Sequence, residues 1–136
     1  MASIGLGEAD LRADLGVTEN GGLLYARSRI INAAAAAGLL PPHMSVHPDV
    51  GDVDGLRRSC EVGHRLGFLG RAAIHPRQLP VIAEVFRPSE DDVARARELV
   101  EAAETSGSGA VLTAAGRFVD EAVLRRARRT LALAGG

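Results

Sequence analysis

The chain has 136 residues, 46% of them hydrophobic and 24% charged, which is typical of a globular protein with one small domain and excludes disordered and collagen-like classes. Sixteen basic and seventeen acidic residues give a net charge of −1, so the balance favours neither nucleic acid nor a membrane as a partner. Every basic residue is arginine. Without lysine, Schiff-base aldol chemistry is excluded.

Cysteine usage and the start of the chain indicate a cytoplasmic protein. The lone Cys60 cannot form an internal disulfide, and we expect it to be a small core residue. The first residues do not show the basic segment followed by an apolar segment that is typical of a signal peptide. No apolar run approaches the roughly 20 residues that span a bilayer.

The first half of the chain predicts strands alternating with helices. Residues 1–12 are expected to be the end of a short strand that enters a glycine-rich turn. Apolar residues at helical spacing predict a helix over 23–37, which Gly38 and two prolines end. A short strand is then expected over 44–47.

The next segment predicts a further helix, strand and helix. Asp52 is placed to cap a helix that ends at Gly67, with Val53, Leu56, Cys60 and Gly63 on its inner face. The apolar run 68–74 predicts a strand buried on both faces, and 78–86 a short helix. This alternation favours three parallel βα units.

After Pro88 the pattern changes to helices. Ser89 and Asp92 form a capping box ahead of an amphipathic helix with Val93, Ala96, Val100 and Ala103 on one face. A Gly/Ser linker at 106–109, a hairpin around 114–116 and a last helix with Val123, Ala127 and Leu131 inward are expected to follow. We therefore divide the chain into 1–88 and 89–136.

Polar residues that follow the expected strands are the first candidates for chemistry. They are Asp10, Asp49 and His75. Asp10 can hold a hard cation such as Mg²⁺, or it can cap a helix. His75 can act as an acid or base or donate to a substrate oxygen, or it can be a hydrogen-bonded structural residue.

Two other groups favour structural interpretations. His43 and His47 are expected in an extended run, about 13 Å apart, which argues against a zinc site. Arg125, Arg126, Arg128 and Arg129 could bind a phosphate, but a solvated helix face whose cations complement the helix dipole is favoured.

Three segments stand out together in their order and spacing: LGEADLRADLG at 6–16, LGFLGRAAIHPRQ at 66–78 and GRFVD at 116–120. They closely resemble the citrate lyase beta subunit family, part of the wider HpcH/HpaI group of aldolases and malyl-CoA or citramalyl-CoA lyases. The resemblance covers the C-terminal half of that family. It implies an α/β fold comprising about three βα units from the end of a TIM (β/α)8 barrel, plus a helical C-terminal extension.

The resemblance also implies an activity and its residues. The activity is Mg²⁺-dependent carbon–carbon cleavage or formation on a 3-hydroxyacyl-CoA thioester, which agrees with the absence of lysine. Asp10 is similar to a Mg²⁺ carboxylate of the family. Asp120 is similar to an acid or base that the extension inserts into a neighbouring subunit, which implies a homo-oligomer, a trimer or larger. Arg71, His75 and Pro76 match a substrate-binding segment at the CoA-facing mouth.

Three departures from the family pattern bear on activity. Arg71 stands where the family usually has lysine, and His43-Met44 stands where it has an Ile-Asp pair. The family's first metal glutamate and its substrate-binding arginine belong to strands outside this chain. We therefore expect the chain to be inactive alone. Two alternatives are a non-catalytic oligomerising or binding module and a small enzyme formed by two paired half barrels.

Overall fold

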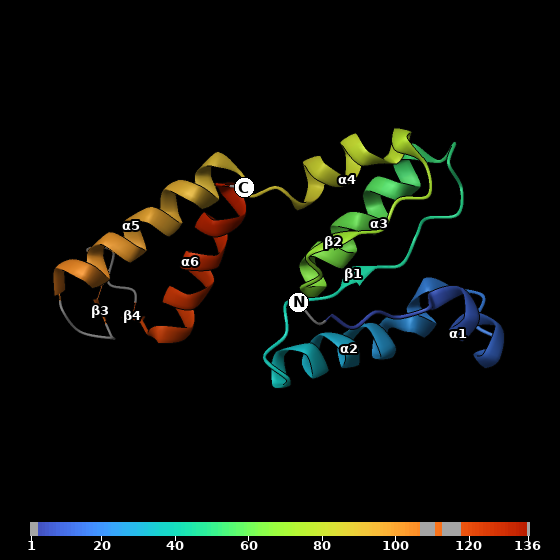
Figure 1. Ribbon diagram of the computed structural model, residues 1–136, viewed down its shortest axis with the longest axis horizontal. Coiled ribbons are helices and arrows are strands. Elements are labelled where there is room, and N and C mark those ends of the chain that lie inside the picture. The colour runs from blue at the N-terminus through green and yellow to red at the C-terminus, as the bar shows by residue number, and fades with distance from the viewer. Residues whose placement is uncertain (1–2, 107–110, 113–117, 136) are drawn as a thin grey trace. The chain divides into compact units, whose positions relative to one another are not determined.

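The computed structural model describes residues 3–106, 111–112 and 118–135, and the chain divides into two compact units, Met1–Phe86 and Arg87–Gly136 (Figure 1). The change of pattern in the sequence placed a boundary after Pro88, two residues further along. Among the described residues, no helix is long and apolar enough to cross a membrane.

The first unit opens with two α-helices joined by a 3₁₀ helix. Helix α1 (Glu8–Leu15) ends at Gly16, whose φ of 64° is the left-handed conformation that glycine adopts most easily. The short 3₁₀ helix η1 (Asn20–Leu23) leads into α2 (Leu24–Ala36), which confirms the predicted second helix. The strand expected at the start is wrong for residues 3–7, where a turn runs straight into α1 and no neighbouring strand offers backbone partners.

A parallel strand pair with a helical crossover makes this unit an α/β structure. Strand β1 (His43–Met44) pairs with β2 (Gly70–Arg71), with His43 opposite Gly70. Helix α3 (Val53–Leu66) connects them; Asp52 caps it by accepting from the Gly55 N–H at 2.8 Å, and Gly67 ends it, as predicted.

Both strands are shorter than the sequence predicted. The run 68–74 forms a strand only at 70–71, because β1 offers just two residues to pair with. The expected strand 44–47 is likewise reduced to 43–44. Further along, the Ile74 N–H donates to the Gln78 side chain at 3.0 Å instead of to a strand. Two short strands therefore replace the three expected.

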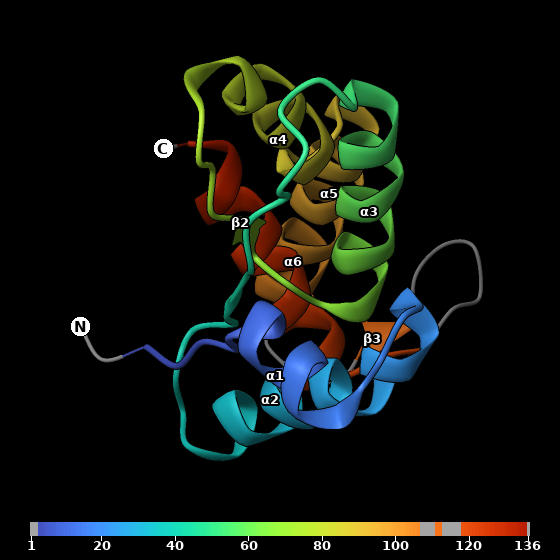
Figure 2. The same ribbon diagram turned by 90° about the vertical axis from the view of Figure 1, so that its right-hand side faces the viewer.

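The core of the first unit lies between α3 and α4 (Leu79–Phe86), which Figure 2 shows side by side. Helix α4 follows the short η2 (Pro76–Gln78), close to the predicted 78–86. Leu56, Cys60, Val81 and Ile82 are buried together, so Cys60 is the core residue that was expected. Val53, by contrast, is about half exposed and does not belong to the inner face.

The second unit is a pair of packed helices and a two-stranded antiparallel ribbon. Helix α5 (Glu90–Ser106) begins at the predicted capping box, in which the Asp92 N–H donates to Ser89 Oγ at 3.1 Å. Strands β3 (Val111–Leu112) and β4 (Phe118–Val119) pair as a hairpin would, while the turn predicted at 114–116 and linker residues 107–109 lie outside the described residues.

Helix α6 (Glu121–Ala134) packs on α5 and completes the core of the second unit. Leu124 and Ala127 are its buried residues, while Val123 is exposed. The prediction of Val123 as an inward residue is therefore wrong by one position. The apolar face passes through Leu124 because Val119 and Ala103 form a buried cluster with that side chain.

Candidate functional site

Asp10 lies in the first turn of α1 with an exposed side chain. It is the third residue of the helix, and the capping position belongs to Gly7, so Asp10 does not cap the helix. A Cβ at Gly7 would lie 3.2 Å from Asp10 Oδ2, so glycine there keeps the space around the carboxylate open. Among the described residues the carboxylate has no hydrogen-bond partner, and it is a suitable ligand for a hard cation.

A buried ion pair holds the helix that carries Asp10. Arg27 of α2 donates from Nε to Glu8 Oε1 and from Nη2 to Glu8 Oε2, both at 2.7 Å. Glu8 is the only buried residue of α1. A helix of eight residues is too short to be stable on its own, so this bidentate contact fixes α1 against α2 and thereby places Asp10.

Arg71 is a buried cation whose hydrogen bonding is incomplete. Its side chain belongs to a residue that is 8% exposed. The Nη2 atom donates to Ser59 Oγ at 2.7 Å and lies 3.3 Å from Met44 Sδ. The Nε atom is buried and has no hydrogen-bond partner among the described residues. Burial lowers the pKa of Arg71, and the charges of Glu8 and Arg27 also act on it. Arg71 therefore belongs to the same region as the α1–α2 ion pair.

The departure at position 44 explains part of this environment. Met44 is 1% exposed, and a Cβ at Gly63 of α3 would lie 1.9 Å from its Sδ. The thioether therefore fills the space between β1 and α3. A thioether is only a weak acceptor, so it neither neutralises nor fully satisfies the guanidinium of Arg71.

His75 and Pro76 begin the turn that follows β2, and both are exposed. His75 caps η2, with its Nδ1 accepting from the Arg77 N–H at 3.1 Å. In the neutral ring this places the proton on Nε2, which is then free to donate. The turn is held by the buried Gln78, whose Nε2 donates to the His47 carbonyl at 3.0 Å.

Asp120 belongs to the second unit. It is exposed and caps α6, with Oδ1 accepting from the Val123 N–H at 3.0 Å. Its second carboxylate oxygen has no hydrogen bond among the described residues. Asp120 therefore combines a structural role with a free oxygen.

Within the described residues, no hydrogen bond or ion pair joins the predicted site residues to one another. Asp10 stands two residues from Glu8, whose charge acts on Arg71, and His75 follows Arg71 by four residues. Residues 3–106, 111–112 and 118–135 contain no group of three or more His, Cys, Asp or Glu side chains that could jointly hold a metal ion. The described residues therefore place no group of three such side chains around Asp10.

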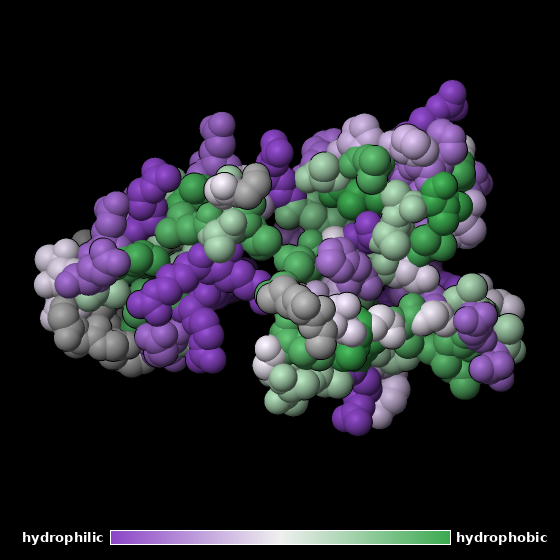
Figure 3. Space-filling model, in the orientation of Figure 1, coloured by the Kyte–Doolittle hydropathy of each residue, from purple (hydrophilic) through white to green (hydrophobic). Residues whose placement is uncertain are grey.

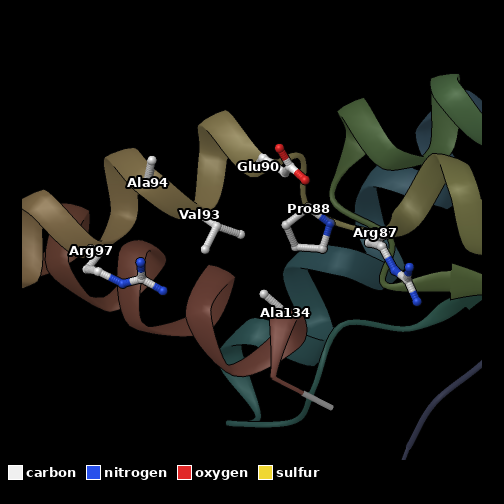
Figure 4. A pocket seen from close by; sticks show the side chains of 7 residues that line it. All are labelled: Arg87, Pro88, Glu90, Val93, Ala94, Arg97 and Ala134. Atoms are coloured by element: carbon white, nitrogen blue, oxygen red, sulfur yellow. The ribbon is translucent and has the colours of Figure 1, made fainter.

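One hollow of the second unit contains none of the predicted site residues. It has a volume of about 510 Å³ and is lined by the start of α5 and the end of α6, where Val93 points toward Ala134 (Figure 4). Asp120 lies at the other end of α6. This hollow is therefore separate from the candidate site.

Four residues around the site were missed by the sequence analysis: Glu8, Arg27, Ser59 and Gln78. The partners Glu8 and Arg27 are 19 residues apart, so no local pattern links them. Arg27 stands three or four residues from Leu23, Leu24 and Ile31, so it shares the apolar spacing of the predicted helix 23–37. A charged residue at such a position is the signal that predicts a buried partner.

Comparison with known proteins identifies the family. The family model for HpcH/HpaI aldolase/citrate lyase matches residues 1–76, which is more than half of the chain. The chain belongs to this family. The recognition drawn from the three sequence segments is thereby confirmed.

Individual relatives match most of this chain. The citrate lyase subunit beta of Leuconostoc mesenteroides subsp. cremoris is 37% identical over 82% of the chain, and the mitochondrial citramalyl-CoA lyase of Homo sapiens is 37% identical over 94%. A crystal structure of protein CitE from Mycobacterium tuberculosis in complex with magnesium, acetoacetate and coenzyme A is 33% identical and covers 94% of this chain with a TM-score of 0.74.

The chain is shorter than these family members. It spans 37% of the Leuconostoc protein, 39% of the human protein and 50% of the Mycobacterium tuberculosis chain in the crystal structure. This chain therefore spans half or less of the length of these relatives.

Proposed function

We propose that this chain is the C-terminal part of a Mg²⁺-dependent carbon–carbon lyase that cleaves a 3-hydroxyacyl-CoA thioester of the citryl-CoA, malyl-CoA or citramalyl-CoA type. Residues 1–88 would form the last βα units of a TIM barrel, and 89–136 a helical extension. The observation that carries the proposal is the match of 94% of the chain to a protein solved with magnesium, acetoacetate and coenzyme A.

Mg²⁺ fits the residues present because Asp10 offers a free, exposed carboxylate beside a glycine that leaves it room. When bound, Mg²⁺ would act as a Lewis acid that offsets charge on the oxygens of the substrate. The other ligands would come from the part of the barrel that this chain lacks. The chain alone would therefore bind the ion weakly and be inactive.

The remaining residues would bind the substrate and move its proton. Cleavage requires the C3 hydroxyl to lose its proton, the C2–C3 electron pair to pass to the thioester enolate, and C2 to gain a proton. Asp120, through its free oxygen, would accept and return this proton in a neighbouring copy of the chain. His75 would donate from Nε2 to a substrate oxygen, Pro76 would shape the mouth, and the Arg71 cation would attract the acyl-CoA's negative charge.

Complementation tests this function. The purified chain with Mg²⁺ and citramalyl-CoA is expected to show no turnover, and an assembled complex with the separately supplied N-terminal part of the Mycobacterium tuberculosis relative is expected to cleave it. Asp10→Asn should abolish that cleavage, while Asp14→Asn, an exposed carboxylate of the same helix, should preserve it. Cleavage by the chain alone would contradict its inactivity, and an inactive purified complex would contradict the lyase proposal.

A non-catalytic oligomerising module is the second candidate, and the exposed apolar surface of the first unit favours it. Leu15, Leu24, Tyr25, Ile74 and Leu79 are all about half exposed or more, and green apolar surface is visible over this unit in Figure 3. Contiguous exposed apolar surface is typical of protein interfaces. A discrete oligomer by light scattering, with one cooperative melting transition, would support the module, whereas aggregation of the isolated chain would support a truncated enzyme.

A further inference from the structure

The middle of α6 carries a concentrated positive charge that its position does not explain. The sequence favoured a solvated helix face for the four arginines, with cations that complement the helix dipole, but the last turn of α6 contains no basic residue. Arg125, Arg126 and Arg129 are the fifth, sixth and ninth of fourteen residues, so none of them lies in the last turn, where the helix dipole stabilises cations. The exposure of the arginines agrees with a solvated face, but the helix dipole does not account for the cluster.

The three side chains also repel one another. Arg125 and Arg129 are four residues apart, and Arg126 and Arg129 three, and like charges at these spacings destabilise a helix. In Figure 3, hydrophilic side chains gather over the region that α6 occupies. This arrangement costs stability unless an anion neutralises it.

Acidic side chains among the described residues neutralise this cluster only in part. Glu121 is the acid of α6, and it pairs with Arg128 at 3.0 Å. Asp92 of α5 acts electrostatically on Arg126, but it is hydrogen-bonded to Ser89 and lies 3.6 Å from Arg95. Within the described part of the chain, neither Arg125 nor Arg129 has a hydrogen bond or an ion pair.

The arginines line a common hollow. Ala122, Arg125, Arg126 and Arg129 line a hollow of about 260 Å³ that is open to solvent. This is below the range of about 300–1,000 Å³ that accommodates drug-sized ligands, and it suits a small anionic group instead. Guanidinium groups bind phosphate oxygens through paired, charge-assisted hydrogen bonds.

We propose that the α6 arginine face, formed by Arg125, Arg126 and Arg129, binds the phosphate groups of a small phosphorylated ligand. Two sources supply this chemistry: the phosphates of coenzyme A, a source that rests on the proposed function, and a free diphosphate compound, which does not. The net charge of −1 disfavours a nucleic acid as the occupant.

Calorimetric titration of the full chain tests this site. Pyrophosphate is expected to bind saturably with one site per chain, and the double variant Arg125→Ala/Arg129→Ala to weaken that binding at least about tenfold. Arg128→Ala is the matched control, because it removes the same charge from the same helix outside the hollow. It should leave the dissociation constant within about twofold of the parent chain. Circular dichroism confirms that the variants, all at exposed positions, keep their helices.

Parallel titrations with coenzyme A and with pantetheine, which lacks phosphates, distinguish the sources. If coenzyme A binds more tightly than pyrophosphate and pantetheine does not bind, the site is assigned to the acyl-CoA substrate. If coenzyme A and pyrophosphate bind equally tightly, the site is assigned to a free diphosphate compound. An absence of saturable binding, or an equal loss in Arg128→Ala, overturns the proposal, because the arginines would then form only a solvated charged face. Since pyrophosphate needs no catalysis, this result is independent of the lyase assay.

Discussion

The buried pair between Glu8 and Arg27 makes a quantitative prediction about the helix that carries Asp10. The side chains are 11% and 5% exposed, and both hydrogen bonds measure 2.7 Å. Replacing Arg27 by methionine keeps the aliphatic bulk but leaves the Glu8 carboxylate buried and uncompensated. Breaking a buried pair in this way costs about 3–5 kcal/mol, a third or more of the stability of many small domains.

The chain contains a matched control for this experiment. Arg57 and Glu84 form an ion pair with the same two-bond geometry, both bonds at 2.8 Å, but their side chains are 37% and 64% exposed. Water already solvates these charges, so Arg57→Met should change the free energy of unfolding far less. The comparison isolates burial as the cause of the larger loss.

Urea unfolding followed by circular dichroism at 222 nm measures both effects on the full chain. The double variant Glu8→Leu/Arg27→Met removes both charges and is expected to be more stable than either single variant, since apolar side chains can replace a buried pair. The reasoning is refuted if Arg27→Met costs no more than Arg57→Met, or if the double variant loses the sum of the two single losses.

Three further predictions concern other described positions. Asp120→Ala should remove the α6 cap and cost about 1 kcal/mol by urea titration, whereas Asp120→Ser should retain most of that stability; equal losses would contradict the capping role. Gly63→Ala should cost about 1–3 kcal/mol because its Cβ would meet Met44 Sδ at 1.9 Å, while Gly5→Ala, with nothing within 4 Å, should be nearly neutral; similar losses would refute the close approach. Burial raises the pKa of the Cys60 thiol above its usual 9.0 in the folded chain, so the unfolded chain loses this proton at a lower pH than the folded chain does. The free energy of unfolding is therefore expected to decrease as the pH rises above 9. A Cys60→Ala variant with the same alkaline decrease would refute this cause.

Local signals predicted the helices well. Asp52 with Gly67 and Ser89 with Asp92 mark helix ends through contacts within a few residues, and the structure confirms them. The strands were overpredicted because a strand requires a partner. The run 68–74 has strand character, but β1 offers only two residues for pairing.

The candidate site was predicted in part. The order and spacing of the three segments identified the family, and the exposed carboxylate of Asp10 agrees with the expected role without testing it. The surroundings could not be predicted, because Arg71 meets Ser59 and Met44 through contacts that cross 12 and 27 residues. Its incomplete hydrogen bonding is a property of packing and has no local pattern.

The sequence by itself determined the family, the helix ends and the absence of lysine, since these depend on residue identity and short-range spacing. Only the tertiary structure decided that Glu8 and Arg27 hold α1 in place and that position 44 is filled by a buried thioether against Arg71. It also decided that the α6 arginines lie away from the end of the helix that would stabilise them. Burial and partner geometry control the energy of a charge, and both arise from residues far apart in the chain.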